Sequence, residues 1–140
     1  MAVLEPEGER SQGAPRPFVE RDGGVTIIAG PCSVESRDQM DEVGAALREL
    51  GVRVMRGGAY KPRTSPHSFQ GLEEEGLKIL RETADRYGLV FVTEVTDSAH
   101  AEVVDAYADM LQIGTRNMAN FSLLKRIGQV TAESRKPVVF

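Results

Sequence analysis

Residues 52–66 read Val52-Arg53-Val54-Met55-Arg56-Gly57-Gly58-Ala59-Tyr60-Lys61-Pro62-Arg63-Thr64-Ser65-Pro66. The run over 52–55 is typical of a β-strand, and the rest predicts a loop rich in cations and glycine. The chain as a whole is acidic, with a formal net charge of −4. A basic loop in an acidic protein indicates an anion site, because arginine and lysine both suit phosphate or carboxylate. Glycines in such a loop let backbone N–H groups approach the ligand.

Apolar runs and amphipathic stretches alternate on both sides of this loop. Strands are predicted near 25–28, 52–55, 89–93, 110–113 and 137–140. Helices are predicted over 38–50, 72–87, 98–107 and 120–131, with Ser98 as a cap and with Gly51 and Gly88 as stops. Residues 1–24 are predicted to be a flexible tail, because prolines and glycines break any periodicity there.

Strands that alternate with helices through short loops predict βαβ units and a parallel sheet. Two architectures remain open at this point, the doubly wound sheet and the (β/α)₈ barrel. The predicted strands recur roughly every 28 residues, so eight units need roughly 224 residues, within the range of a barrel. This chain supplies only the first units and the start of a fifth strand, so we expect the sequence to be incomplete.

Composition excludes several classes of protein. The single cysteine cannot form an internal disulfide, which suits a reducing compartment. No apolar run approaches the roughly 18 residues of a membrane span, and the N-terminus lacks the pattern of a signal peptide. The acidic balance argues against non-specific nucleic-acid binding. We therefore expect a cytoplasmic protein that binds neither membranes nor nucleic acids.

Unusual polar residues follow the predicted strands at their carboxyl ends, where both architectures bind ligands. One group follows each of the first four strands: Cys32; Arg56 with Lys61, Pro62, Arg63, Thr64 and Ser65; Glu94; and Thr115 with Arg116. Because parallel strands end at one edge of a sheet, these groups are predicted to lie along that edge.

Each residue taken alone also has an ordinary interpretation. Cys32 suits a metal ligand, a nucleophile or a small buried side chain. Arg56 is interpreted either as an anion-binding residue or as the partner of Glu94 in an ion pair. Glu94 is interpreted either as a residue that faces the site or as the partner of a structural cation. Lys61 and Arg63 are interpreted either as phosphate-binding residues or as ordinary solvent-exposed cations. The proline between them favours phosphate binding.

Arg116 follows Gly114 and Thr115, whose backbone N–H groups favour joint phosphate binding with the guanidinium. The two histidines, His67 and His100, form no metal-type spacing with Cys32. His67 is interpreted as a loop residue.

Five motifs together carry a family resemblance: AGPCSVES at 29–36, RGGAYKPRTSP at 56–66, FQG at 69–71, TEV at 93–95 and LQIGTRN at 111–117. In this order and spacing, they resemble the 3-deoxy-D-arabino-heptulosonate 7-phosphate (DAHP) synthases of the microbial class I beta type, over about residues 25–140. A sister family, the 3-deoxy-D-manno-octulosonate 8-phosphate synthases, shares the Gly-Pro-Cys start but carries an Asn-containing loop in place of residues 61–65. The loop here therefore favours erythrose 4-phosphate as the acceptor.

The resemblance implies that residues 25–140 are the N-terminal half of a (β/α)₈ barrel. It implies a transferase that condenses phosphoenolpyruvate with erythrose 4-phosphate and water to give DAHP and phosphate. That reaction is the first step of the shikimate pathway, which leads to chorismate and the aromatic amino acids. The alternatives are an octulosonate-phosphate synthase and a non-catalytic half-barrel that binds phosphate ligands.

The resemblance also implies residue roles. Cys32 matches a ligand of a divalent metal ion, with manganese, iron, cobalt and zinc left open. Lys61 matches a proton donor, and Glu94 an acidic residue that positions water. Phosphoenolpyruvate is implied to bind Arg56, Lys61, Thr115 and Arg116, and the sugar phosphate to bind Pro62, Arg63, Thr64 and Ser65. Thr115 stands where the family commonly has alanine, a mild change if its backbone N–H makes the contact.

The other metal ligands and a second phosphoenolpyruvate lysine are expected after Phe140. We therefore expect the 140-residue chain to be inactive alone. The full-length enzyme is expected to be a homo-oligomer.

Overall fold

The computed structural model describes residues 3–4, 25–62, 65 and 67–140. Most of the predicted tail lies outside these ranges, as do the candidate sugar-phosphate residues Arg63 and Thr64.

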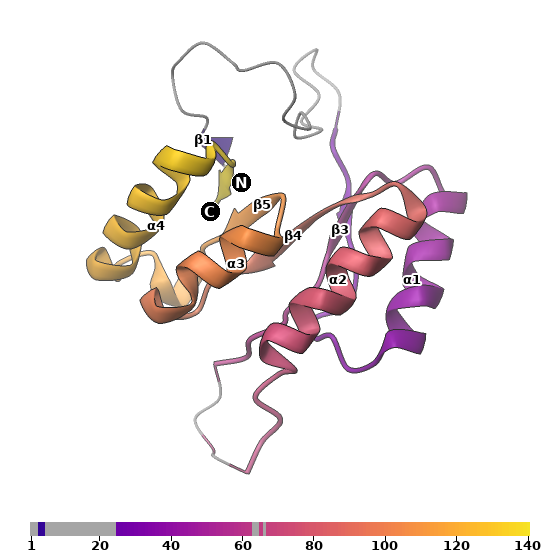
Figure 1. Ribbon diagram of the computed structural model, residues 1–140, viewed down its shortest axis with the longest axis horizontal. Coiled ribbons are helices and arrows are strands. Elements are labelled where there is room, and N and C mark those ends of the chain that lie inside the picture. The colour runs from indigo at the N-terminus through magenta and orange to yellow at the C-terminus, as the bar shows by residue number, and fades with distance from the viewer. Residues whose placement is uncertain (1–2, 5–24, 63–64, 66) are drawn as a thin grey trace.

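Strands and helices alternate along the described chain (Figure 1). The strands are β1 (Val3–Leu4), β2 (Ile28–Ala29), β3 (Val54–Arg56), β4 (Val90–Glu94), β5 (Met110–Gln112) and β6 (Val138–Val139). The α-helices are α1 (Arg37–Glu49), α2 (Glu73–Tyr87), α3 (Ala101–Tyr107) and α4 (Phe121–Ser134), and two short 3₁₀ helices are η1 (Ser98–His100) and η2 (Thr115–Asn117). None of the helices among the described residues is long and apolar enough to cross a membrane.

The strands form one sheet in the order β1-β6-β5-β4-β3-β2. Strands β2 to β6 are all parallel, as predicted, and Met55 lies opposite Phe91 in the register of β3 and β4. Strand β1 pairs antiparallel with β6, with Val3 opposite Val139. This two-residue strand falls within the segment predicted as a tail, and its sequence gave no periodic signal for it.

The two faces of the sheet bury different sets of side chains. Met55, Phe91 and Leu111 pack against the helices in the main core. The alternate strand residues form a second apolar cluster on the opposite face, made only of residues from strands: Ile28, Val54, Val90, Val92, Met110 and Val139. Alternation along each strand requires this division, because successive side chains point to opposite faces.

All four α-helices cover the same face of the sheet, and each packs against the next in chain order (Figure 1). A doubly wound sheet carries helices on both faces, whereas a barrel keeps them all outside. The prediction of a partial (β/α)₈ barrel is therefore confirmed, and the doubly wound alternative is excluded.

Local signals set the ends of the helices. Ser36 caps α1 by accepting a hydrogen bond from the Gln39 N–H at 3.1 Å. Gly51 and Gly88 have φ of +71° and +65° after α1 and α2, as the predicted stops require. The predicted cap at Ser98 is wrong: Asp97 accepts from the Ala99 N–H at 2.8 Å, so the turn begins one residue earlier.

One partly buried charge pair ties the helix layer to the amino ends of the central strands. Arg81 of α2 lies 3.0 Å from both carboxylate oxygens of Asp109. The same carboxylate accepts the Phe91 N–H at 2.9 Å, and the Arg81 guanidinium lies over the Phe91 ring. Removing Asp109 would leave a cation and a backbone N–H without this acceptor.

We predict that Asp109→Ala lowers the free energy of unfolding by about 2–4 kcal/mol, because it breaks a partly buried ion pair and leaves the Phe91 N–H without its acceptor. Asp85→Ala is the matched control, since Asp85 pairs with the same Arg81 but has 68% of its side chain exposed. It should cost less than about 1 kcal/mol. Urea denaturation followed by circular dichroism measures both, and equal losses would contradict the assignment.

Candidate anion-binding site at the strand ends

The described candidate residues lie at the carboxyl ends of β2, β3, β4 and β5 and in the loops that follow them. The described residues of these loops, within 30–36, 57–72, 95–97 and 113–120, are called the rim below, together with the strand-end residues Arg56 and Glu94. Because the four strands are parallel, their carboxyl ends meet at one edge of the sheet. The predicted convergence is thus a consequence of the observed topology.

The first two loops of the rim touch through their backbones. Gly30 has φ of +148°, and a Cβ there would collide with the Arg56 carbonyl oxygen. The Val34 N–H donates to the Gly58 carbonyl at 3.0 Å, and a Cβ on Gly58 would lie 2.6 Å from the Cys32 carbonyl oxygen. Glycine at 30 and 58 is therefore needed for the two loops to approach this closely.

Two cations reach across this contact to neighbouring peptide carbonyls. Arg56 Nη1 donates to the Pro31 carbonyl at 2.8 Å, and Lys61 Nζ donates to the Cys32 carbonyl at 2.7 Å. Neither cation is in an ion pair with Glu94 or with any other carboxylate in the part of the chain that the structure describes. The ion pair between Arg56 and Glu94, one of the two alternatives for Arg56, is therefore not formed.

Arg116 lies in η2 after β5 and is exposed, as is Thr115. It too has no ion-pair partner among the described residues. On the helix layer, by contrast, six cations are paired with carboxylates: Arg37, Lys78, Arg81, Arg86, Arg126 and Lys136. The three rim cations Arg56, Lys61 and Arg116 thus keep their charge without a carboxylate partner among the described residues.

Cys32 is exposed and lies against the rim cations. Its Sγ is 3.3 Å from Lys61 Nζ. The hydrogen bond and charge of Lys61, followed by the charge of Arg56, lower the pKa of the Cys32 thiol. The interpretation as a small buried side chain is therefore wrong, and the environment instead favours a thiolate.

A metal ion is not accommodated by the described residues alone. No group of three His, Cys, Asp or Glu side chains comes together among them. An open catalytic metal site takes about three protein ligands. Cys32 can supply one ligand and no more.

Glu94 ends β4 and lies beside the fourth loop of the rim. Its carboxylate rests against Gly114, where an added Cβ would collide with Oε1. The turn that follows is held by the Asn117 N–H, which donates to the Gly114 carbonyl at 2.8 Å. The structure thus places Glu94 near the Thr115–Arg116 turn.

The loop after Lys61 contains the remaining candidates. Pro62 and Ser65 are exposed, and Ser65 Oγ accepts a hydrogen bond from the His67 N–H at 3.3 Å. The Gln70 side chain donates to the Ser65 carbonyl at 3.0 Å. His67 is an exposed loop residue.

Sequence reasoning missed two features of the rim. The carbonyls of Pro31 and Cys32 orient the cations, and no side-chain pattern reports on carbonyls. Tyr60 and His100 stack with ring centroids 4.2 Å apart. These rings are 40 positions apart in the numbering, so only the fold shows their contact.

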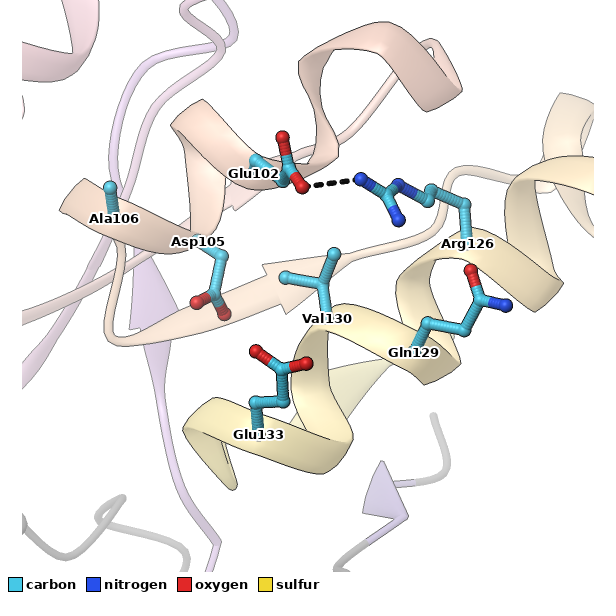
Figure 2. Close-up of a pocket in the computed structure, with 7 residues that line it drawn as sticks. All are labelled: Glu102, Asp105, Ala106, Arg126, Gln129, Val130 and Glu133. Atoms are coloured by element: carbon cyan, nitrogen blue, oxygen red, sulfur yellow. Dashed lines mark hydrogen bonds and ion pairs between the residues drawn. The ribbon is translucent and has the colours of Figure 1, made fainter.

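A pocket on the helix layer has a different character (Figure 2). It lies between α3 and α4 and is lined by Glu102, Asp105, Ala106, Arg126, Gln129, Val130 and Glu133. Arg126 pairs with Glu102, and Asp105 accepts from Ser134 at 2.7 Å. Glu102 is thus paired within the pocket, and Asp105 is bonded to a residue beside it.

A partial barrel with unpaired cations at its strand ends defines the class: the N-terminal part of a (β/α)₈ barrel whose rim suits an anionic ligand. Comparison with known proteins makes the assignment specific. Residues 17–140 match the DAHP synthetase I family, and the chain belongs to that family.

A curated phospho-2-dehydro-3-deoxyheptonate aldolase of Thermotoga maritima is 56% identical over 117 residues, which cover 84% of this chain and 33% of the relative. A 2-dehydro-3-deoxyphosphooctonate aldolase of Bordetella petrii is 39% identical over 93 residues, covering 61% of this chain and 33% of the relative. The crystal structure of the DAHP synthase from T. maritima has a TM-score of 0.75 at 56% identity, over 79% of this chain and 32% of that one. The chain spans about a third of the length of these relatives.

We predict that Lys61→Met slows the reaction of Cys32 with iodoacetamide severalfold at neutral pH. Lys61 lowers the thiol pKa, so its removal raises that pKa and reduces the thiolate fraction. Cys32 is the only cysteine, so mass spectrometry of the chain, with a metal chelator present, gives the rate directly.

The matched control is Lys78→Met, because Lys78 lies on α2 and pairs with Glu74. That variant should react at the wild-type rate. An unchanged rate in Lys61→Met would show that Lys61 does not contact the thiol in solution.

Proposed function

We propose that this chain forms the phosphoenolpyruvate- and erythrose 4-phosphate-binding part of a DAHP synthase. The observation that carries the proposal is the set of rim cations Arg56, Lys61 and Arg116, which have no carboxylate partners among the described residues. Membership of the DAHP synthetase I family supports this choice of substrates.

The substrates suit such a rim. Phosphoenolpyruvate carries a phosphate and a carboxylate, and guanidinium groups bind both in bidentate fashion. Arg56 at the end of β3 and Arg116 in η2 are assigned to these two anionic groups. Lys61 is assigned to the same substrate, with a proton to give at Nζ. Pro62 and Ser65, together with Arg63 and Thr64, are assigned to the phosphate of the sugar.

The proposed reaction joins C3 of phosphoenolpyruvate to the aldehyde carbon of erythrose 4-phosphate. Water adds to C2, and the C2–O bond to phosphate then breaks to give DAHP and inorganic phosphate. Lys61 protonates the aldehyde oxygen, which gains negative charge when C3 attacks its carbon. Glu94 orients the water. In the family this chemistry uses a divalent metal ion, towards which Cys32 would contribute a thiolate. This chain's described residues bind and orient the substrates. We place the reaction in the cytoplasm, in a homo-oligomeric enzyme.

An octulosonate-phosphate synthase is the second candidate, because relatives named 2-dehydro-3-deoxyphosphooctonate aldolase also match. Their identity is lower, 39% against 56%, and the match covers less of this chain, 61% against 84%. Residues 61–65 also differ from the Asn-containing loop of that family. We therefore assign the four-carbon sugar phosphate.

Isothermal titration calorimetry with phosphoenolpyruvate tests the proposed site. Arg56→Ala and Arg116→Ala are each expected to weaken binding by about tenfold or more, since a charge-assisted hydrogen bond contributes about 1.5–3 kcal/mol. Arg126→Ala is the matched control, because Arg126 is paired with Glu102 on the helix layer. Loss of binding in the control but not in the rim variants would place the ligand elsewhere.

The choice of acceptor has its own test. With phosphoenolpyruvate saturating, erythrose 4-phosphate should bind more tightly than arabinose 5-phosphate in the same calorimeter. The opposite order would favour the octulosonate-phosphate synthase. Binding of both sugars with equal affinity would indicate a rim that recognises only phosphate.

A further inference from the structure

His100 has no part in the proposed chemistry, yet it lies against the rim. Its imidazole stacks on the Tyr60 ring at a centroid distance of 4.2 Å and an interplanar angle of 20°. Tyr60 immediately precedes Lys61 in the loop after β3, and His100 closes η1 in the segment after β4. The stack therefore joins the segments that follow two neighbouring strands, β3 and β4.

Both rings are held by their surroundings. Tyr60 is only 7% exposed. The neighbouring peptides are hydrogen-bonded: the Glu73 N–H donates to the Ala59 carbonyl at 3.0 Å, and the Lys61 N–H donates to the Gln70 carbonyl at 2.8 Å. The His100 N–H donates to Asp97 O at 3.1 Å, and the next residue, Ala101, is fully buried. The stack thus rests on two anchored segments.

The chemistry of the imidazole indicates what it contributes. His100 Nδ1 is buried and has no hydrogen-bond partner among the described residues. A ring retained for its hydrogen bonds would pair that nitrogen, because an unpaired buried polar atom costs stability. The flat face of the ring is therefore the feature that the contact uses.

We propose that His100 is a positioning residue for Lys61 and acts through the Tyr60 ring. Clamping Tyr60 fixes the peptide from which the Lys61 side chain extends, so that Nζ stays 2.7 Å from the Cys32 carbonyl and 3.3 Å from its Sγ. Any effect of His100 on substrate binding rests on the proposed function, whereas its positioning of Lys61 does not.

The test compares His100→Ala with His100→Phe and uses the alkylation rate of Cys32 as the reporter of Lys61. His100→Ala should slow the reaction with iodoacetamide severalfold at neutral pH, and His100→Phe should restore it, because phenylalanine keeps the ring face. His67→Ala, in an exposed loop histidine, is the matched control and should leave the rate unchanged.

A general loosening of the fold would give a different pattern. In the Lys61→Met background, His100→Ala should have no further effect, because the reporter cation is already absent. A further change in that background, a wild-type rate in His100→Ala, or failure of His100→Phe to restore the rate would each overturn the proposal.

Phosphoenolpyruvate titration separates this proposal from the proposed function. If wild type binds the substrate, His100→Ala should weaken binding severalfold and His100→Phe should recover it. If wild type binds none, the proposed function fails, while the alkylation cycle still decides whether His100 positions Lys61. Binding that is unaffected by His100→Ala would overturn the link to the substrate.

Discussion

Alternation of side chains along β3, β4 and β5 is the constraint on which the rest of this structure depends. Met55, Phe91 and Leu111 face the helices, so Val54, Val92 and Met110 must face the other way. Because both faces of the sheet are apolar, its parallel strands must be buried on both sides. Because the helices cover one face alone, the sheet must curve as the wall of a barrel. The four loops that follow β2, β3, β4 and β5 then open at one edge, where the polar residues lie.

Elements with strong periodicity were predictable from the sequence, and contacts between distant loops were not. Helix α2 starts and ends within a residue of its prediction, because its apolar spacing and Gly88 are both local signals. The Asp97 cap was misplaced at Ser98, since both residues can cap a helix and only backbone geometry decides between them. Strand β1 has two residues, too few for any period to appear.

The candidate site likewise has features that were predictable from the sequence and features that were not. The convergence of its described residues on one edge was predictable, because charged and thiol side chains follow apolar strands and the parallel topology brings such positions together. Their partners were not predictable. The carbonyls that Arg56 and Lys61 contact belong to a loop 25 and 29 positions away, and the Tyr60–His100 stack depends on how two loops fold over the sheet. The alternative ion pair between Arg56 and Glu94 does not form, because Arg56 donates to the Pro31 carbonyl and Glu94 lies against Gly114.

Neutral acceptors give the rim cations a particular advantage. Arg56 and Lys61 are oriented by adjacent carbonyls, those of Pro31 and Cys32, and a carbonyl orients a cation without cancelling its charge. An arriving anion exchanges with a neutral dipole, which costs far less than displacing a carboxylate from an ion pair. The two cations also repel each other, and a nearby anion relieves that repulsion. The lowered pKa of the Cys32 thiol has the same origin, because Lys61 and then Arg56 favour a negative charge on its sulfur.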